Sequence, residues 1–339
     1  METRNCAWID LLNPSDVQFF KAIISNLPEY EYLITTRDRA ETKSLADSFG
    51  FRYRKIGTDY STPVKKTFNM IYRTFQIMAS NLRFEFAMSF ENAQSTLISY
   101  LRHKKSIQYC DNDLKFVQSN FVQDLESKIK SMSSHVVVPR ACYDLFKKHV
   151  SSDRLVTYDG YKEDVYLADF TPDPRFMENL PFEEYVVLRP EALGSFYVKD
   201  HRSIVPDLLG LLNRENVNVV YLPREKGDRR YADGYDAFIP EKALNGLDLC
   251  YHAKAVLTGS GTFAREAACM GIKSVSFFPG NSLLSVDREL VDHGKILHSR
   301  DPGEIVDYVL SGNNRQPTGD RCLRARNEII EKTRNILCG

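Results

Sequence analysis

The chain has 339 residues, of which 43% are hydrophobic and 27% charged. This is the composition of a globular protein, and the length suits two domains better than a single core. Lys+Arg and Asp+Glu each number 45, so a net charge of zero provides no overall attraction to nucleic acid or to an anionic membrane, and no nucleic-acid partner is expected.

The seven cysteines are scattered and include no CxxC pair. This argues against a structural zinc site and favours reduced thiols in a cytoplasmic compartment. The apolar run in METRNCAWIDLL is too short for a secretion signal or a spanning helix.

Short β-type runs alternate with helical patterns through the first half of the chain. The expected strands are 6–12, 30–36, 51–56, 84–90, 106–110 and 135–139. The expected helices are 16–27, 39–49, 63–82, 92–103, 118–132 and 141–149. Such alternation predicts parallel pairing with right-handed crossovers, and hence a Rossmann-like domain over residues 1–165.

The helix expected at 63–82 has an apolar stripe at helical spacing, which predicts a face turned to the core. The stripe consists of Val64, Phe68, Ile71, Tyr72, Phe75, Met78, Ala79 and Leu82. Met70 and Ile77 fall off the stripe, close to the basic residues Lys65, Lys66, Arg73 and Arg83. We interpret that second face as solvated, with a peripheral membrane contact as the alternative.

Polar residues follow the first strand at 13–16. Asp16 is a candidate for taking a proton from a substrate, provided that its pKa is raised. The alternative is that Ser15 or Asp16 caps the helix expected at 16–27. Asn13 and Ser15 are further candidates for lining a cleft.

Acidic residues also follow two later strands. Asp111 and Asp113 come directly after the strand at 106–110, and Glu91 follows the strand at 84–90. We assign Asp111 and Asp113 an acid/base or acceptor-orienting function, with a polar turn as the alternative, and we expect no metal there. Glu91 is a weaker candidate at the same edge.

A segment with three prolines, residues 166–183, predicts a linker. The alternation then resumes over 184–312, and residues 313–339 form a tail with a polar helix at about 319–336. The strands expected in this second domain are 184–190, 217–223, 235–240, 255–259, 273–279 and 296–299. The helices expected there are 201–214, 242–253, 262–270, 285–293 and 302–310.

The sequence LTGSGTFAREAACMG, at 257–271, places Gly259, Ser260, Gly261 and Thr262 where a buried strand turns into a helix. Glycine allows close approach of the backbone to an anion, and the amino end of a helix attracts phosphate. Glu266 lies one turn after Thr262, where a carboxylate could accept the hydroxyls of a ribose. The alternative is an ordinary capped helix.

Two arginines each end a strand of the second domain beside a proline. Arg189 and Arg224 could neutralise a diphosphate, with surface ion pairing as the alternative. His201 is the histidine expected to reach a cleft.

The segment SGTFAREA resembles the SGG-x-x-EEA element of UDP-N-acetylglucosamine 2-epimerases and the matching element of GT-B glycosyltransferases. Nearly the whole chain resembles domain-of-unknown-function family 354, whose members are labelled predicted glycosyltransferases. The segments that carry this resemblance are WIDLLNPSDVQFF, LITTRD, YCDND, YDGYKEDVYLADFTPDP, VVLRPEALGSFYVK, VVYLPRE and GTFAREAACMGIKSVSFFPG.

The resemblance implies that Ser260, Gly261 and Thr262 hold the nucleotide diphosphate and that Glu266 holds the ribose. It also implies a donor site in the second domain and an acceptor site in the first. The chain departs from the pattern of the epimerases, because RPEALG stands where they carry a His-Arg pair. It also has Asp16 and Gln18 where related chains have histidines.

The sequence thus predicts an α/β, GT-B-like fold with two doubly wound Rossmann-type sheets facing a central cleft. We expect a metal-independent, cofactor-free glycosyltransferase, cytoplasmic or peripheral at the inner membrane face, which uses a nucleotide-diphosphate sugar, UDP-linked, and a saccharide or lipid-linked acceptor. The alternatives are a UDP-N-acetylglucosamine 2-epimerase-like isomerase, a non-catalytic nucleotide-sugar binding protein, and a scaffold that binds a partner.

Overall fold

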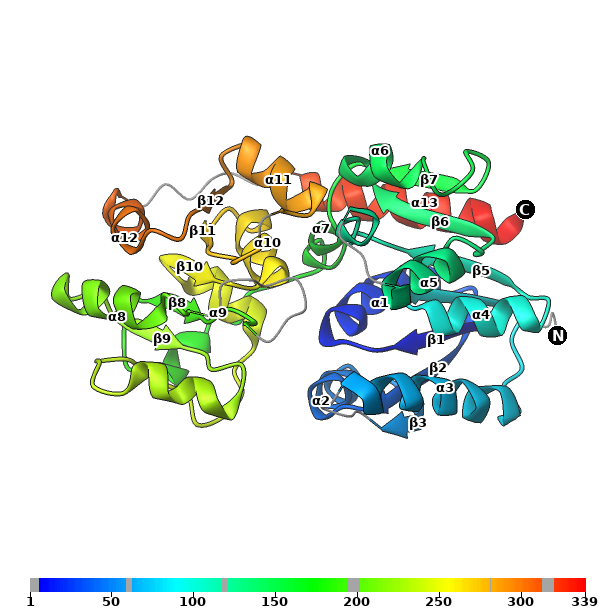
Figure 1. Cartoon of the computed structure of the whole chain (residues 1–339), viewed down its shortest axis with the longest axis horizontal. Coiled ribbons are helices and arrows are strands. Elements are labelled where there is room, and N and C mark those ends of the chain that lie inside the picture. The colour runs from blue at the N-terminus through cyan, green and yellow to red at the C-terminus, as the bar shows by residue number, and fades with distance from the viewer. Residues whose placement is uncertain (1–5, 59–62, 118–120, 194–201, 281, 313–319) are drawn as a thin grey trace. The chain divides into compact units, whose positions relative to one another are not determined.

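The computed structural model describes residues 6–58, 63–117, 121–193, 202–280, 282–312 and 320–339 (Figure 1). The chain divides into two compact units. Unit 1 contains Met1–Tyr166 and Leu323–Gly339, and unit 2 contains Leu167–Cys322. Each unit is built on one parallel sheet with helices between its strands, so the predicted fold class is confirmed.

The sheet of unit 1 has seven parallel strands in the order β3-β2-β1-β4-β5-β6-β7. Their bounds are β1 Cys6–Leu11, β2 Glu31–Asp38, β3 Tyr53–Thr58, β4 Phe86–Phe90, β5 Lys105–Tyr109, β6 His135–Pro139 and β7 Leu155–Tyr158. The chain winds outward from β1 to β3 and then crosses back to β4, which reverses the winding between β1 and β4. The carboxyl ends of β1 and β4 therefore define the switch point at which open α/β sheets bind ligands.

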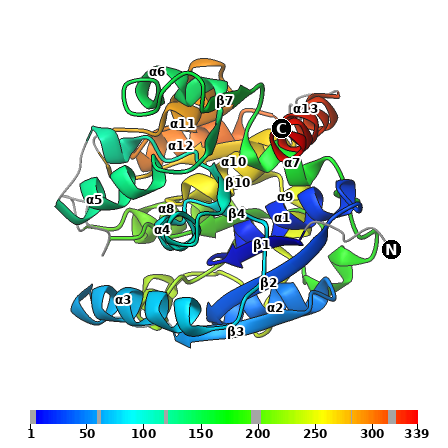
Figure 2. The ribbon, with the colours of Figure 1, turned by 90° about the vertical axis from the view of Figure 1, so that its right-hand side faces the viewer.

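Helices cover both faces of this sheet. Figure 2 shows α1, α2 and α13 on one face and α3, α4 and α5 on the other. The helices of unit 1 are α1 Pro14–Asn26, α2 Ala40–Ser48, α3 Pro63–Ala79, α4 Ala93–Leu101, α5 Phe121–Lys130, α6 Tyr143–Phe146, α7 Lys162–Leu167 and α13 Arg321–Cys338. On the α1 face, the rings of Phe19 and Phe20 meet Tyr109 of β5, whose hydroxyl lies 2.8 Å from Thr333 Oγ1 of α13.

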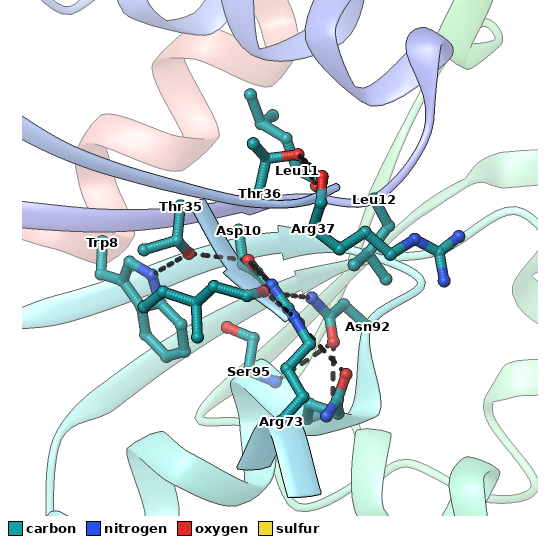
Figure 3. Close-up of polar contacts among 12 residues, drawn as sticks. Trp8, Asp10, Leu11, Leu12, Thr35, Thr36, Arg37, Arg73, Asn92 and Ser95 are labelled. Carbon is teal, nitrogen blue, oxygen red and sulfur yellow. Dashed lines mark hydrogen bonds and ion pairs between the residues drawn. The ribbon is translucent and has the colours of Figure 1, made fainter. Parts of the chain in front are cut away.

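The orientation predicted for α3 is wrong. Ile71, Tyr72 and Phe75 were expected in the core, but they are 49%, 62% and 68% exposed. Arg73 and Ile77, which were expected on the solvated face, are buried. The cause is an ion pair under the helix: Arg73 Nη1 and Nη2 lie 2.8 and 2.6 Å from the two carboxylate oxygens of Asp10 on β1 (Figure 3).

Unit 2 has a five-stranded parallel sheet in the order β12-β11-β10-β8-β9. The strands are β8 Val186–Arg189, β9 Val219–Tyr221, β10 Ala255–Thr258, β11 Lys273–Ser276 and β12 Ile296–His298. The helices are α8 Val205–Arg214, α9 Gly246–His252, α10 Gly261–Cys269, α11 Ser285–Asp292 and α12 Pro302–Leu310. Here the winding reverses between β8 and β10, which sets a second switch point at their carboxyl ends.

The strand expected at 235–240 does not form. Phe238 makes only an isolated parallel bridge to Val220, so this segment lies beside the edge strand β9 without extending the sheet. Residues 166–183, expected as a linker, hold the short 3-10 helix Phe176–Asn179, and the Phe176 ring stacks on His252 with centroids 5.6 Å apart.

Candidate functional site

The glycine-rich turn lies at the switch point of unit 2. Strand β10 ends at Thr258 and α10 begins at Gly261. Gly259 N donates to Arg189 O at 3.1 Å, which ties the turn to the end of β8. A Cβ on Gly259 would lie 2.5 Å from the Cα of Glu191, closer than real atoms approach. Glycine is therefore required here for close packing of two backbones at the switch point.

The amino end of α10 is partly accessible. Ser260 occupies the N-cap position with extended backbone, φ −110° and ψ 116°, and its side chain makes no capping hydrogen bond. Residues 260–262 are half-buried. The first N–H groups of a helix have no acceptor one turn earlier, and their dipoles carry about half a positive charge, so this end has the features of an anion site.

An ion pair bounds the turn on one side. Arg265 Nη1 lies 2.7 Å from Asp287 Oδ1 of α11, and Arg265 Nη2 lies 3.4 Å from Thr262 Oγ1. A Cβ on Gly261 would lie 3.1 Å from Arg265 Nη1 and 3.3 Å from Asp287 Oδ2. The sequence analysis did not single out Arg265 or Asp287, because only the fold brings the two together.

Glu266 and Arg189 lie near each other in unit 2. Burial raises the pKa of the Cys250 thiol, the Glu266 carboxylate raises it further, and Arg189 opposes the rise. The guanidinium of Arg189 also lies 5.8 Å from the ring centroid of Phe263 in the first turn of α10. Glu266 and Arg189, both predicted to bind the donor, therefore both lie near Cys250, and Arg189 also lies beside the first turn of α10.

Arg224 follows the edge strand β9. Its backbone N donates to Asp228 Oδ2 at 3.0 Å, and its side chain is half-buried. Within the described part of the chain, no residue bonds its guanidinium. Arg224 is therefore a cation available to a ligand.

A buried carboxylate that sequence reasoning missed fixes the β8 side of the switch point. The fully buried side chain of Glu191 accepts from Ser203 Oγ at 2.7 Å, Ile204 N at 3.2 Å and Arg300 Nη1 at 3.1 Å. These bonds hold the backbone against which Gly259 packs. Glu191 could have been noticed as an acid directly after a strand-ending Arg-Pro pair.

At the switch point of unit 1, Asp16 is buried at the start of α1. This helix begins at Pro14, two residues earlier than expected, so Asn13 takes the N-cap position in place of Ser15 or Asp16. From the third helical position, Asp16 Oδ2 accepts from Leu12 N at 3.1 Å and Asn13 N at 2.9 Å. Burial raises the pKa of Asp16 to about 6 against the lowering effect of Lys162. Asp16 thus caps the helix, and its raised pKa meets the condition that the sequence analysis set for a proton-accepting residue.

Lys162 joins three of the predicted residues. Its Nζ lies 3.5 Å from Ser15 Oγ and 3.7 Å from Asp111 Oδ2, and 4.7 Å from the ring centroid of Phe90. It lowers the pKa of Asp16, whereas Asp111 raises it. Ser15, Asp16 and Asp111 therefore surround one buried lysine. Lys162 was missed because strand β7, which precedes it, was not expected.

Glu91 supports the loop after β5. Glu91 Oε1 accepts from Asp111 N at 3.1 Å and Asn112 N at 3.0 Å, while its other oxygen pairs with Lys130 and Lys115. Burial would raise the pKa of Glu91, but the two lysines outweigh it and lower that pKa to about 2. A permanently charged carboxylate fixed on all sides positions Asp111 and is poorly suited to proton transfer.

Three other predicted residues remain to be placed. Asp113 is fully buried and helps to raise the pKa of the Cys142 thiol, after the effect of burial. Asn13 Oδ1 accepts from Arg39 Nη1 at 2.8 Å. His201 lies outside the described residues.

No group of three or more His, Cys, Asp and Glu side chains in the described parts of the chain is arranged to hold a metal ion. Over the same residues, no helix is both long and apolar enough to cross a membrane.

The fold and the two switch points define a class of doubly wound α/β protein with a glycine-rich strand-to-helix turn in one unit and buried carboxylates in the other. The family model described as "Protein of unknown function (DUF354)" matches residues 6–334, and the chain belongs to this family.

Three proteins are similar to this chain in sequence or in fold. The uncharacterized protein MJ0665 of Methanocaldococcus jannaschii is 25% identical over 315 residues, which are 89% of this chain and 90% of that protein. The UDP-GlcNAc 2-epimerase of the same organism, solved in complex with UDP-GlcNAc and UDP, superposes with a TM-score of 0.70 at 12% identity, covering 97% of this chain and 99% of that one. The glycotransferase of kitacinnamycin has a TM-score of 0.63 at 10% identity, with 99% of each chain covered. At these identities the two solved structures establish the GT-B-like fold alone.

Proposed function

We propose that unit 2 binds a nucleoside-diphosphate sugar and that the protein transfers the sugar to an acceptor hydroxyl bound by unit 1. The observation that carries the proposal is the turn at residues 258–261, where glycine backbone at a switch point leads into the partly accessible amino end of α10. Because a protein with the same fold has been solved with UDP-GlcNAc and UDP, UDP is the first nucleotide to test.

Each donor-binding residue has a separate function in this proposal. The N–H groups and hydroxyls of Ser260 and Thr262 hold the diphosphate, while Gly261 keeps the approach free of a side chain. Glu266, one turn further along α10, accepts the ribose hydroxyls. Arg189 and Arg224 stabilise the negative charge that develops on the departing diphosphate.

Asp16 is the proposed general base. Its pKa of about 6 leaves it mostly ionised at neutral pH yet basic enough to accept a proton. As the acceptor oxygen bonds to the anomeric carbon, Asp16 takes the hydroxyl proton and the bond to the diphosphate breaks, releasing the nucleoside diphosphate with the electron pair. Lys162 and Asp111 orient the acceptor hydroxyl beside Asp16. We propose no cofactor and no metal in this reaction, and a saccharide or lipid-linked acceptor.

An isomerase is the second candidate. The buried carboxylates Asp16 and Asp111 would suit proton removal and return at a sugar carbon, and a UDP-GlcNAc 2-epimerase shares the fold. One observation argues against an isomerase. The epimerase pattern has a His-Arg pair in the loop after β8, but this chain has Glu191 there, and its carboxylate is already hydrogen-bonded to Ser203 and Arg300. Incubation with UDP-N-acetylglucosamine alone separates the two, since an epimer or solvent deuterium at C2 would replace transfer as the reaction.

The binding step is tested by thermal shift with a panel of nucleoside diphosphates. UDP should raise the melting temperature of the wild type, and Glu266→Ala should lose most of that rise. The matched control is Glu215→Ala, which removes an exposed carboxylate at the end of α8. If no nucleoside diphosphate stabilises the wild type, the donor site is wrongly assigned.

The chemical step is tested by the pH profile of kcat/KM once an acceptor supports turnover. Wild-type activity should fall as pH drops through about 6, because protonated Asp16 cannot act as a base. Asp16→Asn should lower the rate by about 10²–10⁴-fold and abolish that acid limb.

We also infer a cytoplasmic location, which the seven free thiols support.

A further inference from the structure

Helix α3 departs from the usual polarity of a surface helix, although it buries Ile77. Such helices bury an apolar stripe and expose polar residues. Over residues 70–79, α3 instead buries the guanidinium of Arg73 and exposes the large apolar side chains of Ile71, Tyr72 and Phe75. Figure 2 shows α3 beside the edge strand β3 at the lower border of unit 1.

The ion pair to Asp10 holds α3 in this orientation. Asp10 is fully buried and also accepts from Thr35 Oγ1 at 2.7 Å and Asn92 Nδ2 at 2.8 Å (Figure 3). Gly57 of β3 has φ +81°, and a Cβ there would lie 2.8 Å from Arg73 Cδ, so glycine makes room for the arginine. Rotating α3 to bury its aromatic rings would carry Arg73 to solvent and leave Asp10 buried without its ion-pair partner, which is costly. The outward apolar face is therefore a fixed feature of the fold.

The apolar surface continues onto α4. Gln94 Nε2 donates to Met70 O at 2.7 Å and Thr74 Oγ1 at 2.9 Å, which places the two helices side by side. Leu101 lies two helical turns after Gln94, on the same face of α4, and is 51% exposed. The surface formed by Ile71, Tyr72, Phe75 and Leu101 is called the α3–α4 surface below.

The sequence around this surface is strongly basic. Residues 61–110 contain seven Lys and Arg but only two acids, Glu85 and Glu91, although the whole chain has no net charge. Arg73 is buried against Asp10 and Lys104 pairs with Glu85, so the excess of positive charge comes from the other five basic residues. Residues 61–84 contain no acid at all. Arg83 and Lys105 are exposed. Apolar side chains on a helix with basic surroundings are the combination that binds anionic lipid.

We propose that the α3–α4 surface binds an anionic membrane surface. Tyr72, Phe75 and Ile71 would enter the interfacial layer, and the basic residues around them would contact lipid phosphates. A second copy of the chain fits less well, since a symmetric contact would bring two copies of the same basic region together. The proposal does not depend on the proposed sugar transfer.

Flotation with phospholipid vesicles tests this surface. The wild-type protein should float with vesicles of equal parts phosphatidylcholine and phosphatidylglycerol, but not with phosphatidylcholine alone, and added salt should weaken the binding. Phe75→Asp and Tyr72→Asp should each reduce binding about tenfold or more. Leu310→Asp is the matched control, because Leu310 is an apolar residue of α12 that is 40% exposed.

Folding is checked by the melting temperature, which both aspartate variants should retain because the replaced side chains are exposed. Three results would overturn the proposal: no flotation of the wild type, equal loss in Leu310→Asp, or loss of flotation only where a variant also loses its fold. Light scattering addresses self-association. A wild-type dimer that Phe75→Asp dissolves, without vesicle binding, would assign the surface to a second copy.

Discussion

The two sheets both reverse their winding between a central pair of strands, but the residues at the two reversals differ in kind. At β8 and β10 of unit 2, two backbones meet at Gly259, and a half-exposed helix start follows. At β1 and β4 of unit 1, ionisable side chains are buried, among them Asp10 and Asp16. The same topology thus places closely packed backbone at the reversal in one unit and buried ionisable side chains at the reversal in the other.

This difference has physical consequences. Backbone N–H dipoles and exposed cations attract an anion without needing to change protonation state, which suits binding. Buried carboxylates have pKa values set by their surroundings, so they can be tuned in opposite directions. In the same unit, the pKa of Asp16 is raised to about 6 and the pKa of Glu91 is lowered to about 2. The proposed function therefore assigns proton transfer to unit 1.

The largest effect should come from breaking the ion pair under α3. Arg73→Met would leave Asp10 buried and charged, and we expect a loss of about 3–5 kcal/mol in the free energy of unfolding of unit 1. Urea unfolding measures it. The double variant Asp10→Asn with Arg73→Met should be clearly more stable than Arg73→Met alone. If the double variant is no better, the cost arises from lost packing and unit 1 does not depend on this charge pair.

Asp16 should make stability depend on pH in the sense opposite to an ordinary carboxylate. Its folded pKa of about 6 exceeds the unfolded value of 3.8, so the unfolded state releases the proton first. Asp16 therefore favours folding below pH 3.8, and this contribution is lost as pH rises through 6, by about 3 kcal/mol. Asp16→Asn should lack that decline.

The measurement is the free energy of unfolding of wild type and Asp16→Asn at pH 4 and pH 7. Glu91 begins to lose its own stabilising contribution below pH 4.5, but this loss is the same in wild type and Asp16→Asn and cancels in the comparison. Asp207→Asn is the control, since this carboxylate of the first turn of α8 is half exposed. If the free energy of unfolding depends on pH in the same way in wild type and in Asp16→Asn, the pKa of Asp16 is not raised by the fold.

Both switch points follow from the sequence because polar residues after buried parallel strands gather at one edge of a sheet. This reasoning found Asp16, Asp111 and the turn at Gly259 from local pattern alone. It missed Lys162 because β7 has only four residues and too little periodicity to stand out.

The rest depends on partners far apart along the chain. A helical stripe tells which residues share a face but not which face is inside, and for α3 the answer was decided by Asp10, 63 residues before Arg73. The pair of Arg265 with Asp287 spans 22 residues in the same way. Long-range ion pairs of this kind leave no periodic signal in a sequence.

The substitution Gly259→Ala tests whether the switch point of unit 2 requires close packing between the backbones of Gly259 and Glu191. Gly259→Ala would place Cβ 2.5 Å from Glu191 Cα, so the two strand ends must separate. We expect a loss of about 1–3 kcal/mol in the free energy of unfolding and loss of UDP-dependent stabilisation. Gly227→Ala is the control, because nothing lies within 4 Å of its Cβ position. A stable Gly259→Ala that still responds to UDP would separate the turn from binding.

The smallest effect should come from Arg224, and it separates a binding cation from a structural one. No described residue bonds its guanidinium, so Arg224→Ala should change the free energy of unfolding by less than about 0.5 kcal/mol. If Arg224 contacts the diphosphate, the variant should bind UDP about tenfold more weakly, as measured by calorimetry. The control is Arg214→Ala, at the exposed end of α8, which should change neither the free energy of unfolding nor the affinity for UDP. If UDP affinity is unchanged in Arg224→Ala, the anion site is confined to the α10 turn and Arg189. A cation that affects neither the stability of the fold nor the affinity for UDP does not contribute to holding the donor.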